Sequence, residues 1–255
     1  MVHEWYKMNS FDFDRGKLEK GIVILSVGSC EQHSRHLPVG TDGWIGYRLC
    51  FDASTMCVTD AYLLPPQVFG YSPHHRAFMG YVTLSQETMF RYYLEVCECV
   101  FEQGVKKMLI VNSHGGNQSC LQTVVNELGA KYGYNCLLVR YWDLIVDEVE
   151  KTRRSGNGGM GHAGEFETSV MEYLYPDLVK AEGIADYPPA EGNEYHGPDM
   201  FAKNKVYQYK PFDEYSKDGN VGQPQFASSE EGKTLYEAAV GELAKLIDFY
   251  AANDF

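Results

Sequence analysis

The sequence predicts an α/β fold in which helices cover both faces of a mainly parallel central sheet, so that the domain has three layers. Two observations support this prediction. Short apolar runs end at turn residues and alternate with stretches of helical periodicity. The runs are apolar at successive positions, which is typical of strands buried on both faces. Functional sites in such sheets form beyond the carboxyl ends of the strands, so the residues that follow the strands are the first candidates.

Three segments are predicted to be strands. Ile22–Val27 is a β-rich run followed by a glycine, Lys107–Val111 is a second run, and Asn135–Tyr141 is a third. The second and third flank a helical stretch. Residues 107–141 therefore form a predicted βαβ unit, for which general topology rules indicate parallel pairing.

Four helices are predicted from apolar residues at helical spacing. Their ranges are residues 85–103, 119–132, 165–174 and 230–251. Gly133 is the predicted stop of the second helix, because glycine readily adopts the left-handed conformation that ends many helices. The third helix is expected to stop before Pro176.

Residues 183–227 contain many Gly, Pro, Asp and Tyr and show little periodicity. A long irregular segment of this kind is a lid, a subunit contact or an extended surface arm. We therefore expect a single domain over residues 1–255, with an irregular arm or lid at about residues 183–227.

The composition restricts the class of protein. The 255 residues carry a formal net charge of −13, and a surface this acidic repels nucleic acid. No apolar run approaches the ~18 residues that a membrane span needs, and residues 1–14 are polar where a signal peptide has its apolar core. We expect a cytoplasmic protein with no nucleic-acid or membrane partner. Its seven cysteines are interpreted as reduced, mostly buried thiols outside the site.

The first group of reactive side chains follows the first predicted strand, within residues 28–42. Glu31 and His33 are two positions apart, so their side chains point to the same side of an extended backbone. Asp42 returns after a turn that contains Pro and Gly. Carboxylate oxygen together with imidazole nitrogen is the ligand set of Zn, Mn or Fe sites.

Two further groups follow later elements. Asn112–Asn117 comes after the second predicted strand and contains His114 beside two glycines, which allow the backbone to approach a ligand closely. His162 and Glu165 are three positions apart and share a helix face if that helix starts early. Glu167 points away from that pair on an ideal helix, so it reaches the site only if the first turn is irregular.

Each group taken alone has a structural explanation, since a lone His beside a glycine is usually a satisfied structural residue. Three such groups at strand-to-helix junctions are poorly explained by coincidence, and we interpret them as one site. The adjacent His74 and His75 point apart in an extended backbone. At most one of them is therefore expected to face the site, and His75 is the better candidate.

Residues 31–42 (EQHSRHLPVGTD) resemble the signature EQHGPHLPLGTD of the creatininase (creatinine amidohydrolase) family. Residues 112–117 (NSHGGN) are similar to its NGHGGN segment, and residues 162–169 (HAGEFETS) to its HAGExETS segment. The three matches occur in the family order. The sequence is thus identified as a member of the family's Gly-Gly-Asn branch, and not as creatininase proper.

The resemblance implies a creatininase-like fold that holds two divalent metal ions per chain, which are Zn, Mn or Fe. In such a site Glu31 and His33 would each bind one metal, and Asp42 would bridge the two. His114 would complete one side.

The resemblance also implies roles for four further residues. His162 would be the acid/base group that passes a proton to the leaving nitrogen, and His36 would orient the ligands. Creatininase proper has a Glu where this sequence has Gly116. Glu165 is our expected fifth ligand in compensation, and Glu167 is the alternative or a catalytic partner of His162.

Departures from the family pattern concern the substrate. Creatininase proper has a Trp-Asp pair four and three residues before its catalytic His, where this sequence has Gly158 and Gly159, so creatinine is a poor candidate. Residues 71–80 resemble a family segment YGxSxEHxxFPGT, with His74 in place of the Glu. The substrate pocket is expected to include Ser72, His75 and Gly115.

We therefore predict a metal-dependent amidohydrolase that cleaves a C–N bond, other than an ordinary peptide bond, in a small cyclic or linear amide. A water activated by the dinuclear metal site would be the nucleophile. One alternative is a metal-dependent hydrolase of another bond type, and another is a non-catalytic ligand-binding homologue that kept the fold. The expected partner is a small-molecule substrate, and the resemblance implies a homohexamer.

Overall fold

A five-stranded parallel sheet forms the centre of the structure, a computed structural model that describes residues 1–253. The strand order is β1-β3-β2-β4-β5, and all four pairings are parallel. The strands are β1 (Val2–Glu4), β2 (Ile22–Val27), β3 (Ala61–Leu63), β4 (Lys107–Asn112) and β5 (Asn135–Arg140). This arrangement confirms the predicted α/β fold with a parallel sheet.

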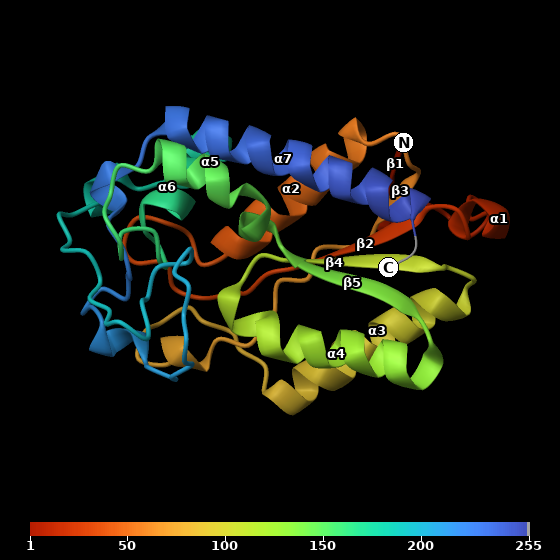
Figure 1. The fold of residues 1–255 in the computed structure, drawn as a ribbon, viewed down its shortest axis with the longest axis horizontal. Helices are drawn as coiled ribbons and strands as arrows, with labels where there is room; N and C mark the ends of the chain where they lie inside the picture. Colours follow the sequence, from red (N-terminus) through yellow and green to blue (C-terminus); the bar gives the residue numbers. More distant parts are fainter. Residues whose placement is uncertain (254–255) are drawn as a thin grey trace.

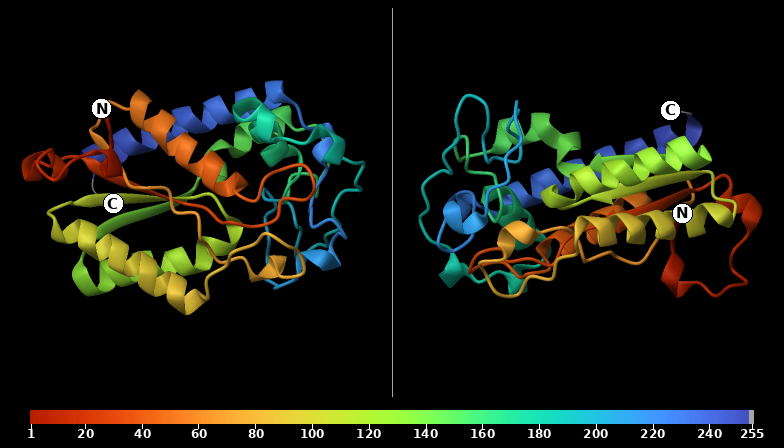
Figure 2. Two further views of the ribbon diagram at one scale, coloured as in Figure 1. Left: turned by 180° about the vertical axis from the view of Figure 1, so that it is seen from behind. Right: turned by 90° about the horizontal axis from the view of Figure 1, so that it is seen from below.

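Helices cover both faces of this sheet (Figures 1 and 2). One face carries α2 (Thr41–Met56), α6 (Glu165–Leu174) and α7 (Ser229–Ala252), and the other carries α3 (Gln86–Glu102) and α4 (Gln118–Tyr132). The short helices are α1 (Arg15–Leu18) and α5 (Val146–Thr152). Alternate residues of β2 enter opposite cores: Ile22 and Ile24 pack on the α7 side, while Val23 and Leu25 pack on the α3 side.

The four predicted helices are α3, α4, α6 and α7, and each begins and ends within one residue of the prediction. Local chemistry explains these ends. The side chain of Ser85 accepts a hydrogen bond from the Thr88 N–H and caps α3. Gly133 follows α4 with φ +67°, a conformation that favours glycine.

The sequence patterns did not predict α2, which begins inside the first reactive segment. Small and polar side chains make up much of its buried face, including Thr41, Gly43, Gly46 and Ser54, so the apolar periodicity is weak. A side chain at Gly46 would collide with the Ser113 side chain. The helix therefore needs small residues because it packs closely against the end of β4.

Residues 183–227 lie at the carboxyl edge of the sheet, at the end of the molecule away from both chain termini (Figure 1). Short 3₁₀ turns are the regular structure in and next to this segment, at Ala181–Gly183, Phe212–Glu214 and Pro224–Phe226. We refer to residues 183–227 as the arm.

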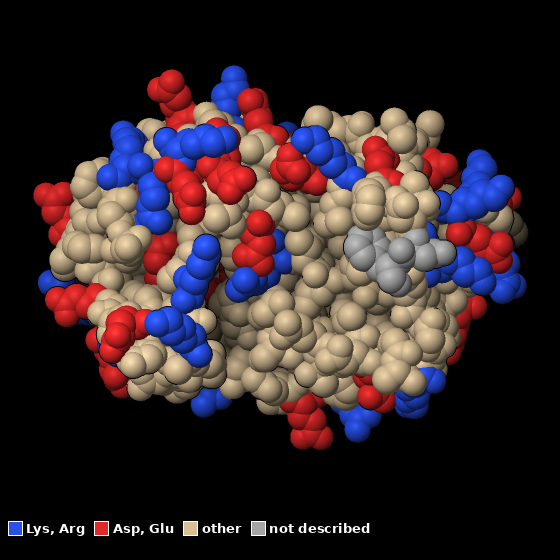
Figure 3. All heavy atoms as spheres, viewed as in Figure 1, with Lys and Arg blue, Asp and Glu red and all other residues tan. Residues whose placement is uncertain are grey.

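The face of the molecule seen in Figure 3 is hollowed, and several basic side chains stand around the hollow. No helix within residues 1–253 is both long and apolar enough to cross a membrane.

Candidate metal centre

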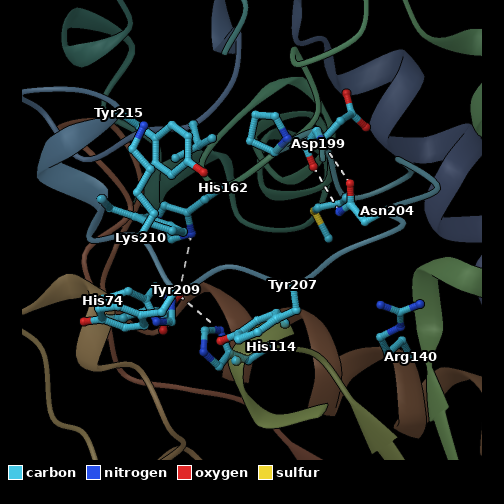
Figure 4. A pocket seen from close by; sticks show the side chains of 18 of the residues that line it. His74, His114, Arg140, His162, Asp199, Asn204, Tyr207, Tyr209, Lys210 and Tyr215 are labelled. Atoms are coloured by element: carbon cyan, nitrogen blue, oxygen red, sulfur yellow. Dashed lines mark hydrogen bonds and ion pairs between the residues drawn. The ribbon is translucent and has the colours of Figure 1, made fainter. Parts of the chain in front are cut away.

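Buried carboxylates and imidazoles meet at the carboxyl edge of the sheet. Figure 4 shows three of the imidazoles, those of His74, His114 and His162. Glu31 and His33 follow β2, Asp42 lies in the first turn of α2, and His114 follows β4. Each of these four side chains is at most 6% exposed. The sheet brings them together because Val27 and Asn112, the last residues of β2 and β4, are register partners.

One group of ligand atoms lies around His114. Its Nδ1 is 3.2 Å from Glu31 Oε1 and 3.2 Å from Asp42 Oδ2. Its Nε2 lies 3.1 Å from the Tyr71 carbonyl oxygen and donates its proton there. That bond directs Nδ1 at the carboxylates, which is the orientation typical of a metal-binding histidine.

A second group lies around His33. Its Nε2 is 3.1 Å from Asp42 Oδ1 and 3.9 Å from Glu167 Oε2. Its Nδ1 donates to the Glu31 carbonyl oxygen at 3.1 Å, so Nε2 faces the carboxylates. Asp42 thus belongs to both groups, with one oxygen toward each.

The residues present fit a pair of divalent cations. The ligand atoms of His33, Asp42 and Glu167 lie within 4.8 Å of one another, as do those of Glu31, His74 and His114. Glu31 Oε2 and Asp42 Oδ2 are buried and accept no hydrogen bond from residues 1–253. Buried carboxylate oxygens without a partner are costly unless a cation occupies the space between them.

The pKa shifts of the buried side chains also indicate a site suited to cations. Burial by itself would lower the pKa of His33, but Asp42 and Glu167 outweigh it and raise that pKa to about 9. Burial, with the charge of Asp42, raises the pKa of Glu167 to about 7 against the opposing effect of His33. The buried acids of the centre therefore favour positive charge beside them, which a bound cation would supply.

The structure does not bring Glu165, our expected fifth ligand, into either group. Its oxygens accept the backbone N–H groups of Arg154 (2.6 Å) and Ser155 (2.8 Å). Ala163 has φ +48°, so the chain turns sharply and α6 begins only at Glu165. Since His162 precedes the helix, the helical-face argument that linked it to Glu165 does not apply, and Glu167 faces the centre.

His162 lies beside both groups, and its ligand atom is also within 4.8 Å of those of Glu31 and His33. Its Nε2 donates to the Gln32 carbonyl oxygen at 2.6 Å, and its Nδ1 lies 3.6 Å from Glu31 Oε1. Burial and the neighbouring His33 and His75 hold the pKa of His162 well below its usual range. The imidazole is therefore neutral, with a bare Nδ1 directed at the metal centre.

His74 and His75 both face the centre, whereas we expected at most one of them to do so. His75 Nε2 is 3.1 Å from Glu31 Oε1, and His74 stacks on His114 with ring centroids 5.6 Å apart. The difference arises because residues 73–75 form a 3₁₀ turn and not an extended segment. The family segment with a Glu at position 74 was the available indication that this position lies near the site.

Gln32 was also missed, although it lies inside the matched signature. Its Nε2 donates to His75 Nδ1 (2.8 Å) and to the Gly219 carbonyl oxygen (2.9 Å). Its Oε1 accepts the Ser34 N–H at 2.7 Å. Ser34 has φ +59° and stands where the family signature has Gly. Gln32 therefore links the signature to the arm.

The absence of a carboxylate at position 116 has a steric explanation. A side chain at Gly116 would collide with the Tyr71 carbonyl oxygen and the His114 ring, and its Cβ would lie 3.1 Å from His74 Cε1. The position is therefore closed to larger residues in this chain.

The other predicted site residues are His36, Ser72 and Gly115, and only Gly115 lines the cavity. His36 Nε2 contacts Thr168 Oγ1 at 2.9 Å, so it contacts α6 beside Glu167 and not a ligand side chain. Ser72 is buried, and its N–H donates to Thr83 Oγ1 at 2.8 Å. Gly115 lines the cavity above the centre, whereas Ser72 does not.

A cavity of about 310 Å³ opens above the metal centre, a volume that suits a small molecule. The arm supplies much of its wall. The Phe212 ring lies 4.6 Å from the His75 ring and 5.1 Å from the His162 ring, centroid to centroid. Arg140, the last residue of β5, lies across the cavity from Lys210 (Figure 4). Trp142, in the 3₁₀ turn that follows β5, also lines the cavity.

Comparison with known proteins identifies the family. The creatininase family profile, described as creatinine amidohydrolase, matches residues 6–247. The chain belongs to the creatininase family. It is therefore a creatininase-family hydrolase with two candidate metal groups.

Several curated relatives of this creatininase-family protein are about equally distant. The creatinine amidohydrolase of Pseudomonas putida is 24% identical over 241 residues, which cover 89% of this chain and 88% of the relative. The 3-dehydro-scyllo-inosose hydrolase of Thermotoga maritima is 24% identical, with 89% and 76% covered. The mycofactocin precursor peptide peptidase of Mycobacterium ulcerans is also 24% identical, with 88% and 84% covered.

Solved creatininase structures share the fold. A manganese form of creatininase superposes with a TM-score of 0.82 at 22% identity, covering 98% of this chain and 100% of that one. A variant described as Zn-Zn type superposes with a TM-score of 0.78 at 23% identity, with 94% of each chain covered. The two candidate metal groups of this family member are consistent with a binuclear site of that kind.

Proposed function

We propose that this protein is a dinuclear metal-dependent amidohydrolase that cleaves a C–N bond in a small amide. The observation that carries the proposal is Asp42, whose two oxygens face two different groups of buried ligand atoms. A carboxylate shared in this way would hold two cations close together, as hydrolytic two-metal sites require.

The first metal would be held by Glu31, Asp42 and His114, with His74 within reach. The second would be held by His33, Asp42 and Glu167. When bound, such a pair polarises the scissile carbonyl and supplies a nucleophilic water at neutral pH. Because the ligands mix oxygen and nitrogen, Zn, Mn and Fe all suit the site.

His162 is the proposed acid/base residue. It is neutral, its Nε2–H is fixed on the Gln32 carbonyl oxygen, and its bare Nδ1 faces the centre. A histidine in this state takes a proton at Nδ1 and returns it to a leaving nitrogen. The fixed Nε2 bond keeps the ring in one orientation during both transfers.

The substrate is proposed to differ from creatinine. Ala190 of the arm donates its N–H to the Gly158 carbonyl oxygen at 3.0 Å, and a side chain at Gly158 would collide with Ala190. The place of the family's Trp is thus covered by the arm. The named substrates of the relatives range from creatinine to a peptide precursor. Because the substrate differs among relatives, the residues of the arm and the cavity wall would determine which amide this protein accepts.

The test combines metal analysis with turnover. Protein purified without added metal should contain about two equivalents of transition metal per chain. A panel of lactams, formamides, short peptides and cyclic ketones is then assayed with the wild type and with His162→Ala. We expect hydrolysis of at least one amide and a loss of about 10²- to 10⁴-fold in kcat for the variant.

The matched control is His3→Ala, since His3 lies in β1 far from the centre along the sheet. Its turnover and metal content should equal those of the wild type. Protein that binds no metal on titration would refute the proposal, as would hydrolysis confined to ketones. Loss of metal in His162→Ala would instead identify His162 as a ligand.

A further inference from the structure

The arm places one cation against the cavity wall. Lys210 lines the cavity, and its Nζ lies 3.9 Å from the centroid of the Tyr215 ring. Tyr215 in turn contacts Phe212, with 6.0 Å between ring centroids, and Phe212 contacts His162 at 5.1 Å. Two aromatic rings, those of Tyr215 and Phe212, therefore link Lys210 to the proposed acid/base histidine along one wall of the cavity (Figure 4).

This ammonium group lacks an acidic partner. Among residues 1–253, no carboxylate forms an ion pair or hydrogen bond with Lys210. Asp213 and Glu214 follow it in the sequence, but they are exposed and do not line the cavity. The contact with Tyr215 stabilises the position of a cation without neutralising it.

The other charged groups of the cavity are already matched. Arg140 on the opposite wall donates through Nε to Asp143 Oδ2 at 2.7 Å. Asp199 accepts from Arg153 at 2.8 Å and from backbone N–H groups. The acids of the floor, Glu31, Asp42 and Glu167, are the proposed metal ligands. Lys210 is thus the unmatched fixed charge of the cavity within the described residues.

We infer that the substrate carries a carboxylate and that Lys210 binds this group while the amide lies on the metal centre. The inference rests on the proposed function and names its substrate class. A single ammonium suits a singly charged anion, because it offers one charge and no bidentate fork. The aromatic side chains between Lys210 and His162 suit an apolar or planar body that separates the carboxylate from the scissile bond.

The experiment uses ligand pairs that differ only in charge: pyroglutamate and pyroglutamide, N-acetylglycine and its amide, and hippurate and its amide. Their affinities for the metal-loaded protein are measured by calorimetry, and their hydrolysis is followed in parallel. In the wild type we expect the acid of at least one pair to bind about tenfold or more tightly than the amide. Direct contact of a carboxylate with a metal would also favour acids. The inference is therefore tested by whether the preference for the acid is lost when Lys210 is replaced.

Three variants provide that decision. Lys210→Met should bring the acid-to-amide affinity ratio close to one, and Lys210→Arg should retain most of the wild-type ratio, since it keeps the charge. Lys217→Met is the matched control, because Lys217 is an exposed lysine of the same arm that does not line the cavity. Its ratio should equal that of the wild type.

An unchanged ratio in Lys210→Met would overturn the inference, as would failure of every acid to bind. Hydrolysis of amides without preference for the acids would also overturn it, but would leave the proposed function standing. A preference for acids that depends on Lys210, without any hydrolysis, would support the binding site and refute the proposed activity.

Discussion

Glu165 and Glu167 lie two residues apart at the start of α6, and their carboxylates have different surroundings. Glu167 faces His33 and Asp42, whereas Glu165 accepts the N–H groups of Arg154 and Ser155. One of these acids is suited to bind a metal, and the other to fix the chain that leads into residues 158–162.

Glu167→Gln should therefore reduce the bound metal from about two equivalents per chain to about one, because an amide is a weaker metal ligand than a carboxylate. Glu165→Gln should keep both metals. It should lower the free energy of unfolding by about 1–3 kcal/mol, since Gln has one acceptor oxygen in place of two and one of the two N–H groups loses its acceptor.

Elemental analysis and denaturant unfolding of both variants make the comparison. Each is the control for the other, as both remove one negative charge from the same helix turn. Loss of metal in Glu165→Gln with full occupancy in Glu167→Gln would reverse our assignment.

The sequence allowed much of the site to be predicted, residue by residue. Glu31, His33, Asp42 and His114 were predicted from ligand chemistry at strand ends, and parallel strands bring such positions to one edge. Periodicity could not predict the place of His74 or the orientation of Glu167, because both depend on turns: a 3₁₀ turn at residues 73–75 and a left-handed residue at Ala163. For His74, the family segment with a Glu at that position was the one available indication.

At the level of elements, α6 and α7 pack closely through a glycine. A Cβ at Gly232 would collide with the carbonyl oxygen of Ser169 in α6, whereas a Cβ at Gly241 would meet no atom within 4 Å. Both glycines lie within α7, so they form a matched pair.

Gly232→Ala should destabilise the protein by at least about 1–3 kcal/mol, because the two helices must separate. Gly241→Ala should stabilise it by about 0.5–1 kcal/mol through helix propensity alone. Urea denaturation measures both. Equal effects of the two substitutions would show that the close approach at Gly232 does not constrain the helix pair.

Elements with a clear apolar pattern were predicted to within one residue, and α2 was not predicted. Strands β2 and β4 and helices α3 and α7 bury large apolar side chains at regular spacing, and that spacing is visible in the sequence. The buried face of α2 is small and polar, because this helix carries Asp42 and passes close to Ser113. Its function thus obscures its secondary-structure signal.

For the whole molecule, metal binding and stability should be linked. The centre buries three acids whose mutual repulsion opposes folding, and metals that bind only the folded state add stability. Removal of metal with a chelator should lower the melting temperature by about 5–10 °C, which corresponds to ~2.7 kcal/mol at a metal concentration of 100 Kd.

Calorimetry before and after chelation, followed by addition of metal, checks this prediction. Glu167→Gln should show a smaller decrease, because it has less metal to lose. A melting temperature that does not change when elemental analysis shows the metal to be removed would contradict the link.

Trp142 makes ligand binding in the cavity measurable by tryptophan fluorescence. Its indole is 2% exposed and lines the cavity, and its Nε1–H has no acceptor among residues 1–253. The chain has two other tryptophans, Trp5 and Trp44, neither of which lines the cavity. When both are replaced by Phe, the remaining tryptophan fluorescence comes from Trp142 in the cavity wall. Its intensity and wavelength then report whether a ligand occupies the cavity, even when that ligand absorbs no light and is not hydrolysed.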